Sequence, residues 1–268
     1  MTMNLVDIGA NLAHDSFAED LPAVLERAQT SGIVQILVTG SDAASSRHAL
    51  AMAQQHPQRL FATAGLHPHH ADQWESGMAE LMRDHAAQPA CRALGETGLD
   101  YFRNFSDRTA QQHAFAAQLA IACDVRMPVF LHQRDAHPDF LPILQEHLPD
   151  LPGAVVHCFT GSGAELDDYL ALDLHIGITG WICDERRGTH LLECVDRIPD
   201  DRLMIETDSP YLLPRTIRPR PQTRRNEPAN LPWVLDTLAQ ARQQERAELA
   251  AITRNNAARF FNLSQPPD

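Results

Sequence analysis

The stretch Arg202-Leu-Met-Ile-Glu-Thr-Asp-Ser-Pro-Tyr-Leu-Leu-Pro214 decides the fold. Its apolar run Leu203-Met-Ile205 predicts a short buried strand. Two carboxylates, Glu206 and Asp208, follow at once, and Pro210 cannot extend a strand ladder. The stretch therefore predicts a buried strand that carries acidic groups at its C-terminal end.

Other apolar runs of the chain end in the same way. Val129-Phe-Leu131 leads to His132, Ala154-Val-Val156 leads to His157, and Ala93-Leu-Gly95 leads to Glu96. Four predicted strands thus end in a side chain that can bind a metal ion. A further predicted strand, Leu60 to Leu66, ends at His67.

Strands and helices alternate along the whole sequence. The expected strands are Leu5 to Leu12, Val34 to Val38, Leu60 to Leu66, Arg92 to Gly95, the run ending at His132, the run ending at His157, His175 to Thr179, and Leu203 to Ile205. The expected helices are Asp20 to Ser31, Ala43 to Gln55, Trp74 to Ala87, Asp107 to Val125, one starting near Pro138, Ala164 to Leu172, Leu191 to Ile198, and two at the C-terminus.

This alternation, with uniformly apolar strands, predicts a parallel sheet covered by helices on both faces. Eight repeats in 268 residues favour a (β/α)8 TIM barrel of the α/β class, formed by residues 1–268 as a single domain. A doubly wound open sheet is the alternative. No linker or change of composition divides the chain.

Composition excludes several classes of function. The net charge of −13 argues against a surface of positive potential for non-specific duplex binding, although positive charge can still be local. The 22 basic residues are all Arg, so a Schiff-base lysine and a carbamylated-lysine metal bridge are excluded. Five cysteines without a Cys-x-x-Cys pair indicate reduced residues. With no signal peptide and no apolar run of about 20 residues, we expect a soluble cytoplasmic protein.

The ends of the predicted strands imply a metal site. In a barrel, all strand C-termini open on one face, so His67, Glu96, His132, His157 and Asp208 should converge there. Imidazoles and carboxylates together suit zinc, manganese or magnesium, and the second carboxylate shifts the preference toward a harder ion. Each residue alone also has a structural interpretation, such as a hydrogen-bonded histidine or a helix cap.

Two nearby residues have weaker interpretations. Asp100 could orient a ligand or an arginine, but a role in a turn is an equal alternative. His69 is expected to be solvated.

These residues lie in motifs that resemble the TatD DNases, metal-dependent hydrolases of the amidohydrolase-like barrel class. The motifs are Asp7-Ile-Gly-Ala-Asn-Leu12, Gly65-Leu-His-Pro-His69, Gly95-Glu-Thr-Gly-Leu-Asp100, His132-Gln-Arg-Asp-Ala136, Val156-His-Cys-Phe-Thr-Gly161, Ile178-Thr-Gly-Trp181, Ile205-Glu-Thr-Asp-Ser-Pro210 and Arg224-Arg-Asn-Glu-Pro228. The resemblance implies that Glu96, His132, His157 and Asp208 are metal ligands. It also implies that Asp208 accepts a proton from the attacking water and that His67 meets the scissile phosphate beside the metal.

One departure from the wider family bears on the metal. Most members have His-x-His at the end of strand one, where this sequence has Gly9 and Asn11. Asn11 offers only a neutral oxygen, which suits Mg²⁺, with Mn²⁺ or Zn²⁺ as alternatives. This form is similar to the branch whose implied activity is a 3′–5′ exonuclease on single-stranded DNA and RNA, with a role in repair of oxidative damage.

Positive charge gathers on loops that follow strands, which suits a phosphodiester substrate. We expect Arg134, Arg224, Arg225, Trp181 and Asn11 to contact the substrate, since guanidinium groups fit phosphate oxygens and aromatic rings stack on bases. A solvated loop is the alternative for the arginines. Phe102 and Phe105 are further candidates for stacking.

Two other functions stay open at this point. One is a different metal-dependent hydrolase on the same barrel, acting on an amide, a lactone or a small phosphoester. The other is a catalytically weakened relative that only binds nucleic acid. Whichever of these functions holds, we expect a monomer without membrane attachment.

Overall fold

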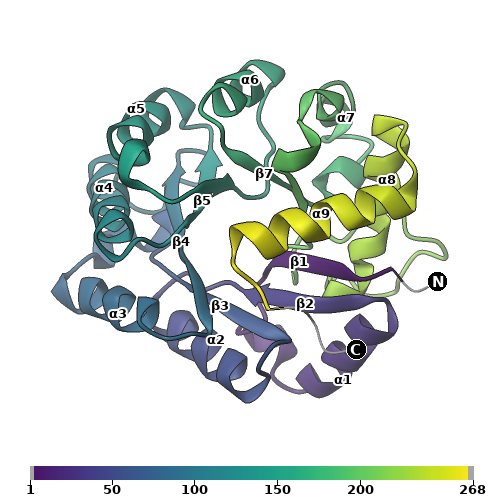
Figure 1. Cartoon of the computed structure of the whole chain (residues 1–268), viewed down its shortest axis with the longest axis horizontal. Helices are drawn as coiled ribbons and strands as arrows, with labels where there is room; N and C mark the ends of the chain where they lie inside the picture. The colour runs from purple at the N-terminus through teal and green to yellow at the C-terminus, as the bar shows by residue number, and fades with distance from the viewer. Residues whose placement is uncertain (1–2, 265–268) are drawn as a thin grey trace. The chain divides into compact units, whose positions relative to one another are not determined.

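The computed structural model describes residues 3–264 as eight strands and nine α-helices, with short 3-10 helices between them (Figure 1). The strands are β1 Leu5–Ala10, β2 Ile33–Val38, β3 Leu60–Ala64, β4 Cys91–Asp100, β5 Val129–Arg134, β6 Ala154–Val156, β7 His175–Ile178 and β8 Leu203–Ile205. The helices are α1 Leu21–Thr30, α2 Ala43–Gln55, α3 Ser76–Ala86, α4 Arg108–Val125, α5 His137–His147, α6 Gly163–Ala171, α7 Thr189–Leu192, α8 Leu231–Arg242 and α9 Arg246–Phe260.

The strands follow one another in the sheet in chain order, from β1 to β8. The pairs β3–β4, β4–β5, β5–β6 and β7–β8 are parallel. An unbroken chain order with a helix after each strand is the topology of a (β/α)8 barrel, whereas a doubly wound sheet reverses its order at a switch point. The barrel prediction is therefore confirmed, and the open-sheet alternative is wrong.

The chain divides into two compact units. Val38–His157 form one unit, and the described residues up to Leu37 and from Cys158 onward form the other. We call them the central unit and the terminal unit. The central unit contains β3 to β6 and α2 to α5, and the terminal unit contains β1, β7, β8, α1 and α6 to α9.

The core of the central unit is built on the buried face of α4. Asp107 caps the start of this helix, because its carboxylate accepts a hydrogen bond of 2.8 Å from the Thr109 amide. About two turns further on, the Phe115 ring stacks on Phe140 of α5 at a centroid distance of 5.0 Å. Both rings are fully buried, and burial of such a side chain is worth about 1.5–3 kcal/mol.

The core of the terminal unit joins α9 to β1 and β8 (Figure 1). The buried Asn256 side chain on α9 donates hydrogen bonds to the carbonyls of Leu203 (2.8 Å) and Asp200 (2.6 Å). These bonds fix the helix across the start of β8, the strand that ends before Asp208. No helix within residues 3–264 is long and apolar enough to cross a bilayer.

Three expected elements differ from the structure. The helix expected over Leu191 to Ile198 is wrong, because α7 stops at Leu192 and only a 3-10 turn, Val195–Arg197, follows. The carbonyls of Val195 and Ile198 accept hydrogen bonds from Arg242 instead of continuing a helix. The first strand ends at Ala10 rather than Leu12, and the fourth runs on past Gly95 to Asp100.

Candidate metal centre

Glu96 lies in the central unit at an irregularity of β4. The register between β4 and β5 shifts between Leu94 and Thr97, and such bulges turn a side chain away from its regular direction. Gly98 has φ of 147°, and a Cβ there would overlap the His132 carbonyl oxygen. The motif therefore needs a glycine beyond Glu96 so that β4 can approach β5 closely.

Three imidazole rings surround one carboxylate oxygen of Glu96. Its Oε1 atom lies 2.6 Å from Nε2 of His157, 2.9 Å from Nδ1 of His132 and 3.3 Å from Nε2 of His67. His67 follows β3, His132 lies in the C-terminal half of β5, and His157 follows β6. The sequence predicted this convergence from strand ends alone, and the structure brings these four residues together.

The cluster has the chemistry of a divalent metal site. Ligand atoms of His67, Glu96 and His132 all lie within 4.8 Å of one another, and the side chains are largely buried. Each neutral ring can present either its N–H or a lone pair toward this oxygen, and a cation among the three rings would use the lone pairs. Imidazole and carboxylate together fit zinc or manganese, and added carboxylate or amide oxygens extend the fit to magnesium.

The pKa values follow from this crowding. Burial lowers the pKa of His67 to about 4, so the ring is neutral at pH 7, and its Nδ1 atom accepts a 3.0 Å hydrogen bond from the His69 amide. Burial alone would raise the pKa of Glu96, but the neighbouring His157 and His67 hold it well below its usual range. The Glu96 carboxylate is therefore ionised, as a metal ligand must be.

Asp100 forms a second layer behind the cluster. Its Oδ2 atom lies 2.8 Å from Nε2 of His69 and 3.3 Å from Nε2 of His132. Burial of His132 opposes protonation, but hydrogen bonds to Asp100 and Glu96 raise the pKa of this imidazole. The other carboxylate oxygen of Asp100 accepts a 2.7 Å hydrogen bond from the Arg103 amide, so Asp100 combines the two roles that the sequence left open, a contact with His132 and a contact within a turn. His69, which we expected to be solvated, is partly exposed, and its ring also binds Asp100.

Asp208 lies in the terminal unit, three residues beyond the end of β8. Its backbone has φ of 51°, and its amide donates a 2.8 Å hydrogen bond to the Gly9 carbonyl. Oδ1 of Asp208 accepts a 3.0 Å hydrogen bond from the Asn11 side chain. The convergence of Asp208 with the four residues of the central unit stays a prediction.

The residues around Asp208 form a buried acidic layer beneath it. Burial raises the pKa of Asp7 to about 8, although hydrogen bonds from Thr207 and Gly9 act in the opposite direction. The Thr207 hydroxyl donates to Asp7 at 2.6 Å, and Glu206 accepts a 2.5 Å bond from the Cys158 amide. Of the two carboxylates predicted after β8, Glu206 is fully buried and Asp208 is partly exposed, so only Asp208 can reach a ligand.

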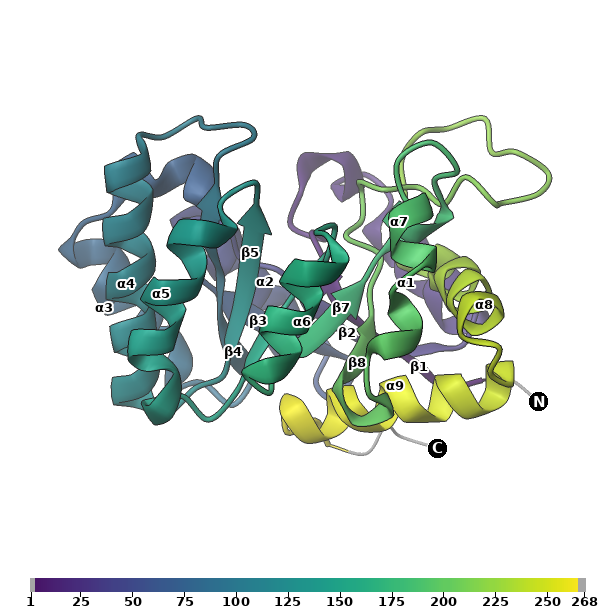
Figure 2. The ribbon, with the colours of Figure 1, turned by 90° about the horizontal axis from the view of Figure 1, so that it is seen from above.

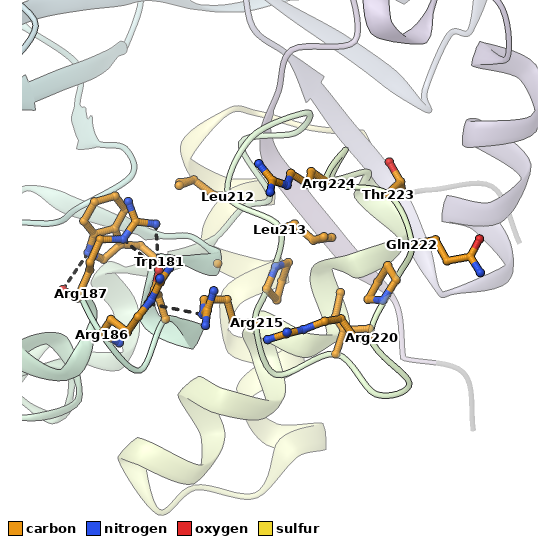
Figure 3. Close-up of a pocket in the computed structure, with 15 residues that line it drawn as sticks. Trp181, Arg186, Arg187, Leu212, Leu213, Arg215, Arg220, Gln222, Thr223 and Arg224 are labelled. Carbon is orange, nitrogen blue, oxygen red and sulfur yellow. Dashed lines mark hydrogen bonds and ion pairs between the residues drawn. The ribbon is translucent and has the colours of Figure 1, made fainter.

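A basic pocket of about 740 Å³ lies in the terminal unit, between the loops that follow β7 and β8 (Figure 3). Five of the chain's 22 arginines line it together with a single acidic residue, Asp184; they are Arg186, Arg187, Arg215, Arg220 and Arg224. Within residues 3–264, Arg220 and Arg224 have no ion-pair partner. The pocket is therefore a local concentration of positive charge in an acidic protein, as the sequence suggested.

The predicted substrate residues occupy different surroundings. Trp181 lines the pocket, with the Arg187 guanidinium 4.3 Å from its ring, and Arg224 lines it from the loop after β8, apart from Trp181 (Figure 3). Arg225 turns away, since both of its terminal nitrogens bond to Asp20 at 2.7 Å. Arg134 belongs to the central unit, where its guanidinium lies 4.6 Å from the Phe102 ring.

Comparison with known proteins decides the family. The family model of the TatD related DNases matches residues 6–262. The chain belongs to the TatD related DNase family. A protein of Erwinia tasmaniensis named 3′-5′ ssDNA/RNA exonuclease TatD is 51% identical over 259 residues, covering 97% of this chain and 100% of the relative. A relative of the same name in Pectobacterium parmentieri is 51% identical over 261 residues, with the same coverage.

Solved structures of TatD proteins share the fold. The crystal structure of YjjV, a TatD homologue of Escherichia coli, aligns with a TM-score of 0.89 at 28% identity, covering 98% of this chain and 100% of that one. A TatD family hydrolase of Entamoeba histolytica aligns with a TM-score of 0.86 at 25% identity and the same coverage. This chain is accordingly a hydrolase of the TatD DNase family on a (β/α)8 barrel.

Proposed function

We propose that this protein is a metal-dependent exonuclease that removes nucleotides from the 3′ end of single-stranded DNA and RNA. The observation that carries the proposal is the set of three imidazole nitrogens within 3.3 Å of one Glu96 oxygen. Relatives that are 51% identical over nearly the whole chain carry the name of this activity. The domain is a single TatD-type barrel over residues 1–268 in this proposal.

We assign the metal ligands to Glu96, His132, His157 and Asp208. A bound divalent ion would act as a Lewis acid and lower the pKa of a water molecule. The ion of choice is Mg²⁺, with Mn²⁺ and Zn²⁺ as alternatives. Asp208 accepts the proton of the attacking water, since it is the partly exposed carboxylate beyond β8 and Asn11 holds its other oxygen.

The remaining roles concern the substrate. His67, which is neutral at pH 7, donates a hydrogen bond to the scissile phosphate beside Glu96. Arg134, Trp181 and Arg224 contact the strand through phosphate oxygens and bases. Asn11 acts through Asp208. The bidentate contact of Arg225 with Asp20 favours a structural role for Arg225 over the substrate contact expected from the sequence.

The cellular setting follows from the same assignment. We propose a cytoplasmic monomer that acts on damaged strands in repair of oxidative damage. Light scattering after size exclusion would test the monomer. Sensitivity of a deletion strain to peroxide, rescued by the wild-type gene and not by an inactive variant, would test the repair role.

A labelled-oligonucleotide assay tests the activity. Metal-stripped protein receives Mg²⁺, Mn²⁺ or Zn²⁺ and a single strand labelled at either its 3′ or its 5′ end. Release of the 3′ label first, with Mg²⁺ sufficient, is the expected result. Release of nothing with any of the three metals, from protein with a folded circular dichroism spectrum, would overturn the proposal. Hydrolysis of a panel of amides, lactones and small phosphoesters by the same protein tests the alternative that it is a different metal-dependent hydrolase.

Variants connect the activity to the site. Glu96→Ala and Asp208→Asn should each lower nucleotide release by at least about 1,000-fold, because a ligand or proton acceptor is lost. Glu146→Ala, which changes an exposed carboxylate on α5 of the same unit as Glu96, is the matched control and should retain full activity. Full activity in both site variants would rule out the assigned roles.

A further inference from the structure

Phe102 and Phe105 are exposed residues of the loop that joins β4 to α4. This loop lies near the carboxyl end of β5 (Figure 2). Phe102 is 56% exposed and Phe105 is 70% exposed, the most exposed of the large apolar side chains in residues 3–264. Exposure of a single apolar residue is ordinary, but two exposed aromatic rings on one short loop point to a ligand-binding surface.

The loop is fixed, so the rings are not exposed through local disorder. At its start, the Tyr101 hydroxyl bonds to Asp139 at 2.8 Å, and the Asp100 carboxylate accepts a 2.7 Å bond from the Arg103 amide. At its end, the buried Ser106 hydroxyl lies 3.0 Å from the His69 carbonyl oxygen. A pinned loop presents its side chains in one arrangement, which reduces the entropy lost on binding.

Phe105 adjoins the metal cluster through a single histidine. Its ring lies 4.8 Å from the His69 ring, and the His69 ring lies 4.1 Å from that of His67. His67 in turn lies 3.3 Å from Glu96. All four residues belong to the central unit. Only His69 lies between Phe105 and His67, the residue assigned to contact the scissile phosphate.

Positive charge accompanies the second ring. The guanidiniums of Arg134 and Arg103 lie 4.6 Å and 5.6 Å from the Phe102 ring centre. Side chains on a strand alternate in direction, so Arg134 shares its side of β5 with His132 of the cluster. A cation and an aromatic face side by side are the pair that a nucleotide requires for its phosphate and its base.

We propose that Phe105 and Phe102 form a platform on which the bases next to the scissile phosphate stack. The proposal rests on the function proposed above and names the contact that holds the end of the strand. Every base has a flat face, and stacking on phenylalanine involves no hydrogen-bond readout. The platform therefore accepts all four bases, as an enzyme that removes successive nucleotides requires.

The test compares substrates with and without a base at the platform. The substrates are an ordinary single-stranded oligonucleotide and versions with a tetrahydrofuran abasic residue as the last or the penultimate nucleotide. Phe105→Ala should lower kcat/KM by about 10-fold on the ordinary strand, as expected for loss of one base stack. On the strand whose abasic residue lies at the platform, the same variant should match the wild type.

Further variants separate stacking from simple packing. Phe105→Trp keeps an aromatic face and should retain kcat/KM, whereas Phe105→Leu keeps apolar area and should lose activity as Phe105→Ala does. Leu192→Ala removes an exposed apolar side chain from α7 and should change nothing. An equal loss on base-containing and abasic strands, or no loss at all, would overturn the platform.

Binding tests the platform apart from turnover. Fluorescence anisotropy of a labelled strand and of a fully abasic strand, without added metal, requires no catalysis. The wild type should bind the base-containing strand about 10-fold more tightly, and Phe105→Ala should remove most of this preference. Equal binding of both strands by the wild type would overturn the platform, even if the exonuclease activity is found. If the wild type preferred the base-containing strand but released no nucleotides, the proposed exonuclease function would be overturned and the platform would stand.

Discussion

The Asn11 side chain donates a 3.0 Å hydrogen bond to the Asp208 carboxylate. The backbone reinforces this contact, because the Asp208 amide bonds to Gly9 and the Asn11 amide bonds to Ser209. The segment after β1 therefore holds the segment after β8. Asn11 thereby orients the Asp208 carboxylate.

Replacing Asn11 should weaken catalysis without unfolding the protein. Asn11→Ala leaves one Asp208 oxygen without its donor, and loss of such an orienting partner costs about 10- to 100-fold in metal affinity or activity. The measurement is the rate of nucleotide release as a function of Mg²⁺ concentration. Asn255→Ala, an exposed amide on α9 in the same unit, is the control. Wild-type rates at every Mg²⁺ concentration would show that Asn11 does not act through Asp208.

Arg224 and Arg225 are neighbours in sequence that should respond differently to the same change. Arg225→Ala breaks a bidentate pair with Asp20 and should lower the free energy of unfolding by about 1–2 kcal/mol. Arg224→Ala should leave stability unchanged but weaken binding of single strands and reduce its salt dependence by about one unit of slope. Urea unfolding and salt-dependent anisotropy give the two readouts for each variant.

The same two variants can also contradict the structural role of Arg225. Suppose that Arg225→Ala reduced the salt dependence of strand binding as much as Arg224→Ala does. The ion pair of Arg225 with Asp20 would then break when the strand binds, and the structural role of Arg225 would be wrong.

The positions of these residues show what the sequence could and could not predict. The ends of the apolar runs predicted the histidines around Glu96, because parallel strands place their C-termini on one face. The partners of Asp100 and Arg225 could not be predicted, since these partners, His132 and Asp20, lie far away along the chain. The same reason explains the wrong helix at Leu191 to Ile198, whose carbonyls bond to Arg242 instead.

Metal should stabilise the folded protein through Glu96. A ligand that binds only the folded state adds about 2.7 kcal/mol at 100 times its dissociation constant. Mn²⁺ should therefore raise the melting temperature of metal-stripped wild type, and Glu96→Gln should abolish most of this rise because a neutral amide replaces the shared carboxylate. Glu146→Gln should respond as the wild type does. A full rise in Glu96→Gln would place the metal elsewhere.

His175 should make the protein less stable in acid. Its Nε2 atom is buried without a hydrogen-bond partner in residues 3–264, and the ring packs 4.7 Å from that of Phe260. Burial, together with Arg202 and Arg259, lowers the pKa from 6.5 to about 4. As pH falls from about 6.5 to 4, His175 becomes protonated in the unfolded chain but stays neutral in the folded protein. The free energy of unfolding therefore declines over this pH window.

The variant His175→Gln has no ring that titrates in this range. Between pH 7 and 4.5, its free energy of unfolding should fall by about 2 kcal/mol less than that of the wild type, after allowance for the partial exposure of residue 175. The measurement is the free energy of urea unfolding at pH 7, 5.5 and 4.5. His48→Gln changes an exposed histidine of α2 and should keep the wild-type profile. Parallel profiles for wild type and His175→Gln would mean that His175 takes up its proton equally in the folded and unfolded chains, through opening of the contact with Phe260.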